Sequence, residues 1–176
     1  YTIPSIAHEY FMREGCYDDT YALAGVVREF INKCLLGGRT MLKNNEKQIV
    51  DDRKVADFDA VSLYPSAMRV MRGFLKGKPK IIDSTINWRS QDGFFVELKV
   101  INIGKHRQFP MMNIMTTDGT RKYTDKIDDF IGNHIYVDRE MLSILEDYHQ
   151  IEYELVRGYY FDEGHNNKIN DVIQEV

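Results

Sequence analysis

Residues 94–103, FFVELKVINI, constrain the fold most, because apolar side chains recur at alternate positions of the run. This alternation and its aromatic and β-branched residues predict a long β-strand. A second strand is predicted at 151–161, directly after an amphipathic helix at 138–150 that Asp138 caps. The segment TTDGT at 116–120 predicts a hairpin, since an Asp-Gly pair accepts positive φ. We therefore expect an α+β fold with a mostly antiparallel sheet and flanking helices.

The rest of the chain adds helices and one further strand to this scheme. Apolar residues at helical spacing predict helices at 6–15 and 20–38, and a Gly-Gly pair ends the second. Residues 53–64 predict a strand that runs into a helix at 65–73, with proline at the first helical position. A last helix is predicted at 166–176.

Charge is distributed unevenly along the chain. The net charge is −4, but residues 125–176 carry −9 and residues 1–124 carry +5. Residues 60–82 contain no acid, and their basic residues are Arg69, Arg72, Lys76, Lys78 and Lys80. This run is either the solvated face of a helix or a strip that binds phosphate groups, and charge alone leaves both interpretations open.

Cys16 and Cys34 fit no zinc-binding spacing and no disulfide framework. They are expected to be free, buried thiols in a reducing, intracellular compartment. No apolar run in the sequence has the length needed to cross a bilayer, so we expect no membrane partner.

The segment DFDAVSLYPS, residues 57–66, places an acid where a predicted strand turns into a helix. The backbone N–H groups at the start of that helix would lie at its positive end and bind phosphate. A carboxylate beside them suits Mg²⁺, which prefers oxygen ligands and substrate phosphates. Asp59 therefore indicates phosphoryl or nucleotidyl transfer. Tyr64, at the turn, would either pack beneath a sugar or anchor the corner between strand and helix.

Residues 59–66 match the D-x-x-S-L-Y-P-S motif, and the chain resembles family B DNA polymerases. The resemblance implies that Asp59 is the first catalytic aspartate of the palm and binds both metal ions, Mg²⁺ or Mn²⁺, in the complete enzyme. It implies that the backbone carbonyl of Ala60 binds one of them. It also implies that Tyr64 excludes ribonucleotides. The nucleotide-binding residues by this resemblance are Ser62, Leu63 and Tyr64.

Two further segments extend the resemblance. LLGGRT, residues 35–40, stands where the family has a Tyr-x-Gly-Gly element that contacts the template, although Leu35 replaces the tyrosine. Residues 138–161 resemble the helix and strand that protein-primed members carry between palm and fingers, where an insertion contacts the terminal protein that supplies the priming hydroxyl. With the basic run included, the expected DNA-binding residues are Gly37, Gly38, Arg39, Arg69 and Arg72.

The resemblance divides the chain into a helical segment at 1–33, a palm segment at 34–82 and an inserted subdomain at 83–176. The family's second palm aspartate, in a Tyr-x-Asp-Thr-Asp turn, and its Lys-x-x-x-Asn-Ser-x-Tyr-Gly fingers helix do not occur. KYTDKIDD, at 122–129, departs from the former pattern and is rejected as catalytic. The chain is therefore expected to be a fragment that is inactive alone.

The function expected from this sequence is that of a protein-primed DNA polymerase that replicates viral, plasmid or transposon DNA. Its expected partners are a DNA primer-template, deoxynucleoside triphosphates and a terminal protein. One alternative is a non-catalytic module whose acidic half, 125–176, binds a basic terminal protein. A less favoured alternative is a Mg²⁺-dependent phosphohydrolase built on Asp57 and Asp59, in which Ser-Leu-Tyr-Pro-Ser would have no role.

Overall fold

A computed structural model describes residues 2–39 and 49–174 of the chain. At its centre is a sheet in which each neighbouring pair of strands is antiparallel. The strand order is β2-β7-β3-β6. These strands are β2 (Lys80–Ile81), β3 (Gly93–Ile103), β6 (Ile135–Asp138) and β7 (Ile151–Phe161). The expected α+β class with a mostly antiparallel sheet and flanking helices is confirmed.

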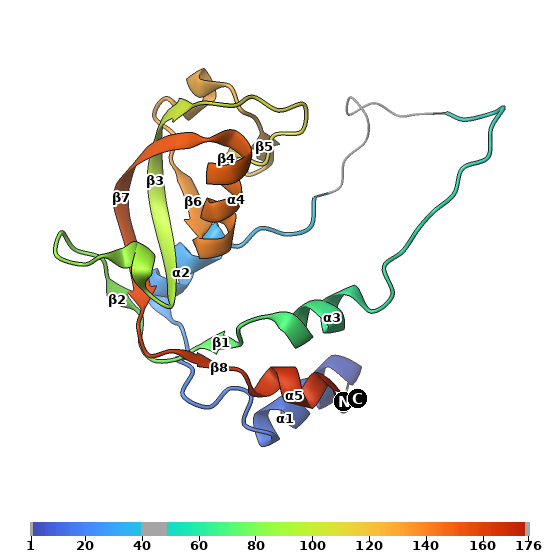
Figure 1. Cartoon of the computed structure of the whole chain (residues 1–176), viewed down its shortest axis with the longest axis vertical. Coiled ribbons are helices and arrows are strands. Elements are labelled where there is room, and N and C mark those ends of the chain that lie inside the picture. The colour runs from blue at the N-terminus through green and yellow to red at the C-terminus, as the bar shows by residue number, and fades with distance from the viewer. Residues whose placement is uncertain (1, 40–48, 175–176) are drawn as a thin grey trace.

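Helices and short strands surround this sheet (Figure 1). The α-helices are α1 (Ile3–Arg13), α2 (Gly25–Cys34), α3 (Leu63–Val70), α4 (Arg139–His149) and α5 (Lys168–Gln174). Short strand pairs are β1 (Phe74–Leu75) with β8 (His165–Asn166), and β4 (Asn113–Met115) with β5 (Arg121–Tyr123). The 3-10 turns are η2 (Trp88–Ser90) and η3 (Ile127–Phe130). Among the described helices, none is both long and apolar enough to span a bilayer.

The alternation in β3 determines which residues of the strand enter the main core. One face of the strand carries buried apolar side chains at every second position, namely Phe94, Val96, Leu98 and Val100. Helix α4 covers this face with Leu142 and Leu145, three residues apart on one side of the helix. The Asp138 side chain caps α4 by accepting a hydrogen bond from Met141 N at 2.8 Å. The two elements with the clearest sequence patterns, β3 and α4, therefore pack against each other.

Helix α2 covers the opposite face of the sheet. Its buried residues are Phe30, Ile31 and Cys34, which pack with Phe161 of β7. The Phe30 ring makes edge contacts with Tyr136 and Tyr159, at centroid distances of 5.6 and 5.2 Å. Cys34 and Cys16 are both buried and free, as predicted.

A third apolar cluster joins the helices that lie away from the sheet. Ile169 and Val172 of α5 are buried against Cys16, with Met71 and Phe74 packed beside them. Figure 1 shows α1, α3 and α5 together below the sheet, with β1 and β8 running between the two groups.

The strands at 94–103 and 151–161, the helix at 138–150 and the hairpin around TTDGT are confirmed. The hairpin closes with a hydrogen bond from Thr116 N to Thr120 O at 2.9 Å, and its glycine takes a φ of 81°. The last helix is confirmed for 168–174, and the expected residues 175–176 lie outside the described part of the chain.

The strand predicted at 53–64 is wrong, because residues 53–60 form no strand and no described segment pairs with them. Alternation of side chains does not make a strand without a hydrogen-bonding neighbour. The following helix begins at Leu63 rather than Pro65. Proline is tolerated anywhere in the first helical turn, since those N–H groups have no acceptor within the helix. The helix predicted at 20–38 is shortened to 25–34.

Candidate nucleotide and metal site

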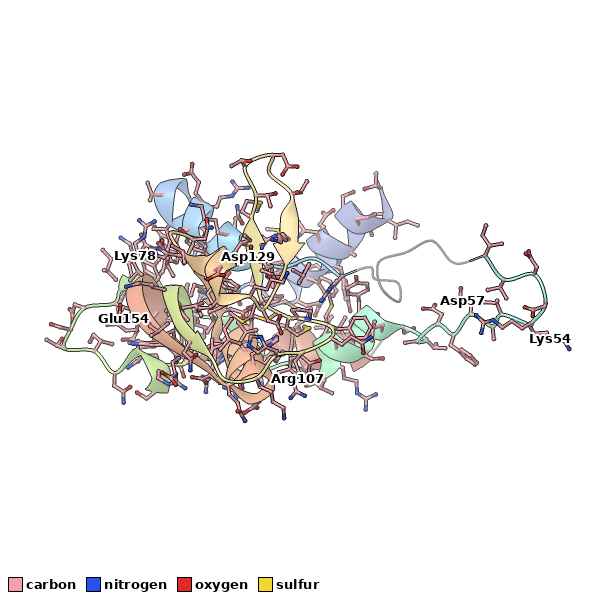
Figure 2. All side chains as sticks on the ribbon, turned by 90° about the horizontal axis from the view of Figure 1, so that it is seen from above. Lys54, Asp57, Lys78, Arg107, Asp129 and Glu154 are labelled. Atoms are coloured by element: carbon pink, nitrogen blue, oxygen red, sulfur yellow. The ribbon has the colours of Figure 1, made fainter. Side chains whose placement is uncertain are left out.

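The segment with the two acids lies on an arm outside the packed body of the protein. Residues 49–62 extend away from the sheet and lead into α3 (Figure 1). Figure 2 shows Lys54 and Asp57 far from Lys78 and Glu154 on the body. Asp59 is exposed on this arm. Its carboxylate is therefore accessible to a cation and is not buried in a core.

Helix α3 begins four residues after this acid, at Leu63, with an unusual turn. Ser62 has left-handed backbone angles, φ 51° and ψ 42°, and its carbonyl accepts a hydrogen bond from Ser66 N at 2.9 Å. The amides of Leu63 and Tyr64 are in the first turn, where the helix supplies no acceptor, and Pro65 has no N–H. Two N–H groups at the positive end of a helix are thereby left for an external acceptor such as phosphate.

The aromatic and apolar side chains around this turn are also exposed. Tyr64 is 77% exposed, and Phe58 and Val61 are about 90% exposed. The alternative in which Tyr64 anchors a buried corner therefore finds no support in the described residues. The Tyr64 ring is free to contact a ligand bound at the start of α3.

Some basic residues of the segment 60–82 form ion pairs with acids of the protein, and others do not. Lys76 pairs with Asp19 at 3.1 Å, and Lys80 pairs with Asp162 at 2.7 Å. Within residues 2–39 and 49–174, Arg69 and Arg72 form no ion pair. These two arginines are on or just beyond α3, close to the motif. Lys78 also forms no ion pair among the described residues, and its ammonium lies 5.9 Å from the centroid of the Tyr21 ring.

The organellar and viral type B DNA polymerase family matches this chain over residues 1–171. The chain belongs to that family. The match covers the arm, the motif at 59–66 and the central sheet, and it supports DNA polymerase function. Family membership implies DNA and deoxynucleoside triphosphates as partners. No curated protein and no solved structure matches the chain.

In this type B polymerase chain, Arg39 follows the Gly-Gly element and contacts the β4–β5 hairpin and the loop before it. Gly37 and Gly38 are exposed in an irregular segment after α2. The Arg39 guanidinium lies over the Tyr123 ring, 4.0 Å from its centroid, and donates to the Pro110 carbonyl. Arg39 therefore has an intramolecular contact that the sequence did not indicate, while its predicted contact with DNA stays a prediction. Thr40, the last residue of LLGGRT, lies outside the described residues.

The acids of KYTDKIDD contact their own hairpin and the adjoining loop (Figure 2 labels Asp129). Asp129 accepts hydrogen bonds from Lys122 at 2.8 Å and from Thr124 at 2.5 Å. The Lys122 ammonium, followed by the Thr124 hydroxyl, lowers the pKa of Asp129 below its ordinary value. Asp125 accepts a hydrogen bond from Arg107 N at 2.6 Å. Asp129 and Asp125 therefore stabilise the segment after β5.

The donor set for a divalent cation is incomplete in the described residues. They contain no group of three His, Cys, Asp or Glu side chains arranged to hold a metal ion. Asp59 and the Ala60 carbonyl offer oxygen atoms, which are the donors that Mg²⁺ prefers. The chemistry of these donors fits Mg²⁺, although a complete site requires further oxygen ligands from substrate, water or other protein segments.

Sequence reasoning missed one buried charge network on the α2 side of the sheet. Glu97 of β3 is 7% exposed and accepts hydrogen bonds from Arg157 at 2.6 Å and His134 at 2.8 Å. Burial alone would raise the pKa of Glu97, but these hydrogen bonds outweigh it and lower the pKa. The signal for this site was an acid among the apolar residues in the first half of the strand.

Proposed function

We propose that this chain supplies the nucleotide-binding and first metal-binding part of the palm in a protein-primed DNA polymerase. The observation that carries this proposal is the junction at Asp59–Tyr64. There an exposed carboxylate precedes a left-handed turn and a helix whose first amides have no acceptor within the helix. Membership in the type B polymerase family supports the same assignment.

Each residue of the junction has a specific role in this proposal. Asp59 and the Ala60 carbonyl bind Mg²⁺ or Mn²⁺, which supplies neutralisation of the charge on the phosphate oxygens. The amides of Leu63 and Tyr64 hold the triphosphate, and the left-handed conformation of Ser62 directs them toward it. The Tyr64 ring lies beneath the sugar and leaves no room for a 2′-hydroxyl.

DNA binding is assigned to the basic residues near this junction. Arg69 and Arg72 contact backbone phosphates of the primer-template, because Lys76 and Lys80 are paired with acids of the protein. Gly37, Gly38 and Arg39 form a second contact region beside the β4–β5 hairpin. Both regions bind DNA without reading its sequence.

The terminal protein is proposed to bind the acidic C-terminal part of the chain. Glu152 and Glu163 are exposed at the start of β7 and just beyond its end. Their neighbours Glu154 and Asp162 are paired with Lys99 and Lys80, at 3.3 and 2.7 Å. Charge complementarity with a basic terminal protein supports this assignment.

The test uses the polymerase that the complete reading frame encodes. Asp59→Asn removes the metal-binding carboxylate charge, and Asp57→Asn is its matched control on the same exposed arm. We expect Asp59→Asn to reduce nucleotide incorporation by about a thousandfold or more, and Asp57→Asn to reduce it by less than about tenfold. Tyr64→Ala is expected to lower selectivity against ribonucleotides. Equal rates for the two asparagine variants would exclude the assignment of Asp59.

The same polymerase is used to test whether DNA synthesis can start from a terminal protein. Extension of a DNA primer is compared with incorporation that depends on the terminal protein. Reversing Glu152 and Glu163 to lysine is expected to weaken only the second reaction, with a loss that salt reduces. An equal effect on both reactions would contradict terminal-protein binding at this surface.

A further inference from the structure

The carbonyl groups at the C-terminal end of α3 accept hydrogen bonds from a side chain in a distant part of the chain, Asn170. The Asn170 amide nitrogen, in α5, donates to the carbonyl of Arg69 at 2.7 Å and to that of Met71 at 2.8 Å. It also lies 3.2 Å from the Met68 carbonyl. The last carbonyls of a helix have no N–H partner within the helix, so Asn170 satisfies them from outside.

The surroundings of Asn170 fix it firmly in place. Ile169 and Val172, beside it in α5, are 1% and 3% exposed. Strand β8 precedes α5 and pairs with β1, which follows α3, through the register Phe74↔Asn166. The Gly73 backbone approaches so closely that an added Cβ would lie 2.2 Å from the Asn166 carbonyl oxygen. The base of α3 is therefore anchored to the segment 165–172.

The other end of α3 has no comparable anchor. None of the helix's residues is buried, and the arm before it is exposed. The eight residues of α3 span about 12 Å, so its first turn is separated from the body by the length of the helix. A small rotation at the Asn170 contact would displace the amides of Leu63 and Tyr64.

We propose that Asn170 is a positioning residue for nucleotide binding: it sets the direction of α3 and thereby the place of the Leu63 and Tyr64 amides. The inference rests on the proposed function of that first turn. Asn170 touches neither substrate nor metal in this proposal, and it acts only through α3.

The chemistry of the contact explains why an amide is required. The amide group brings two N–H donors without charge to a cluster of carbonyl oxygens. A carboxylate of the same shape would instead oppose those oxygens at the negative end of the helix. The Asn170 Oδ1 atom is buried with no hydrogen-bond partner among the described residues. This unsatisfied acceptor is a cost that the contacts of the NH₂ group offset.

The experiment measures dNTP incorporation by the polymerase of the complete reading frame, with KM and kcat determined separately. Asn170→Asp replaces the donors with oxygen, and Asn167→Asp is the matched control, because it makes the same change at an exposed position three residues away. We expect Asn170→Asp to raise the KM for dNTP at least about fivefold, because displacement of positioning groups weakens binding. The control should keep the wild-type KM.

Asn170→Ser retains one hydrogen-bond donor, and it tests the positioning role of Asn170 if Asn170→Asp does not fold. We expect it to raise KM by a smaller factor than Asn170→Asp. A purely structural role would lower kcat with the active fraction and leave KM unchanged for either variant, and that result would overturn the proposal. If Tyr64→Ala relaxes sugar selectivity while the Asn170 variants keep the wild-type KM, only this inference fails. If Tyr64→Ala leaves sugar selectivity unchanged and Asp59→Asn incorporates nucleotide as well as Asp57→Asn does, the proposed function of the junction itself fails.

Discussion

Replacing Glu97 with glutamine removes the charge of a buried carboxylate while keeping its shape. Glu97 receives two charge-assisted hydrogen bonds, each of which contributes about 1.5–3 kcal/mol when fully buried. Both donors are partly in water, since the Arg157 side chain is 59% exposed and that of His134 is 34% exposed. Solvent screening reduces the contribution. We therefore expect Glu97→Gln to lower the free energy of unfolding by about 2 kcal/mol at pH 7.

The loss should depend on pH in a defined direction. The pKa of Glu97 is lower in the folded protein than its ordinary value of 4.5. The carboxylate therefore stabilises the fold fully above that value, and the stabilisation is lost as pH falls through the folded-state pKa. The difference between wild type and Glu97→Gln should shrink over that acidic range, because the wild-type side chain itself becomes neutral.

Urea denaturation of the chain, followed by far-ultraviolet circular dichroism at several pH values, measures this difference. Glu154→Gln is the control, because Glu154 is exposed and pairs with Lys99 at 3.3 Å on the same sheet. Its cost should stay below about 1 kcal/mol. Equal losses for the two variants, or a Glu97→Gln loss that does not change with pH, would refute the reasoning.

Two other experiments test the packing of the fold. Gly158→Ala would place a Cβ 2.6 Å from the Phe95 carbonyl oxygen, so we expect about 1–3 kcal/mol of lost stability in urea denaturation; Gly37→Ala, with open space around it, should change stability by less than about 0.5 kcal/mol. A neutral Gly158→Ala would contradict the β3–β7 register. Burial raises the pKa of the Cys34 thiol to about 12 and also raises that of Cys16, so neither should react with a thiol reagent at pH 8 until denaturant is added. Rapid labelling of the native chain would contradict their burial.

The spacing of apolar residues in the sequence predicted the two longest strands and the helix that covers them. Strands β3 and β7 and helix α4 each have ten or more residues. Strand β3 and helix α4 bury apolar side chains at a regular spacing, whereas β7 buries only its first residue and residues near its end. Strand β6, at Ile135–Asp138, was missed, because four residues provide too little pattern. Residues 53–64 showed the opposite error, since they alternate like a strand but no described segment pairs with them.

The sequence indicated the residue types of the candidate site better than it indicated their arrangement in space. The motif at 59–66 predicted an acid followed by a turn into a helix, because these signals are local. The helix begins at Leu63 rather than Pro65, residues 53–60 before it form no strand, and the catalytic role of the acid stays a prediction. Contacts between distant segments had no such signal. The partner of Lys80 is Asp162, and Asn170 reaches α3 across about a hundred positions of sequence. Only the folded chain brings these residues together.

The limited length of β2 leaves the first part of β7 as an edge of the sheet. Strand β2 pairs with β7 only at Tyr159 and Tyr160, and no described strand lies beside residues 151–157 on that side. An unpaired edge can recruit another chain and start aggregation. Two features oppose such growth here: a β-bulge at Val156, where the register with β3 shifts, and the charges of Glu152 and Glu154. The irregularity of this strand and its acids therefore hinder pairing with a strand of another chain.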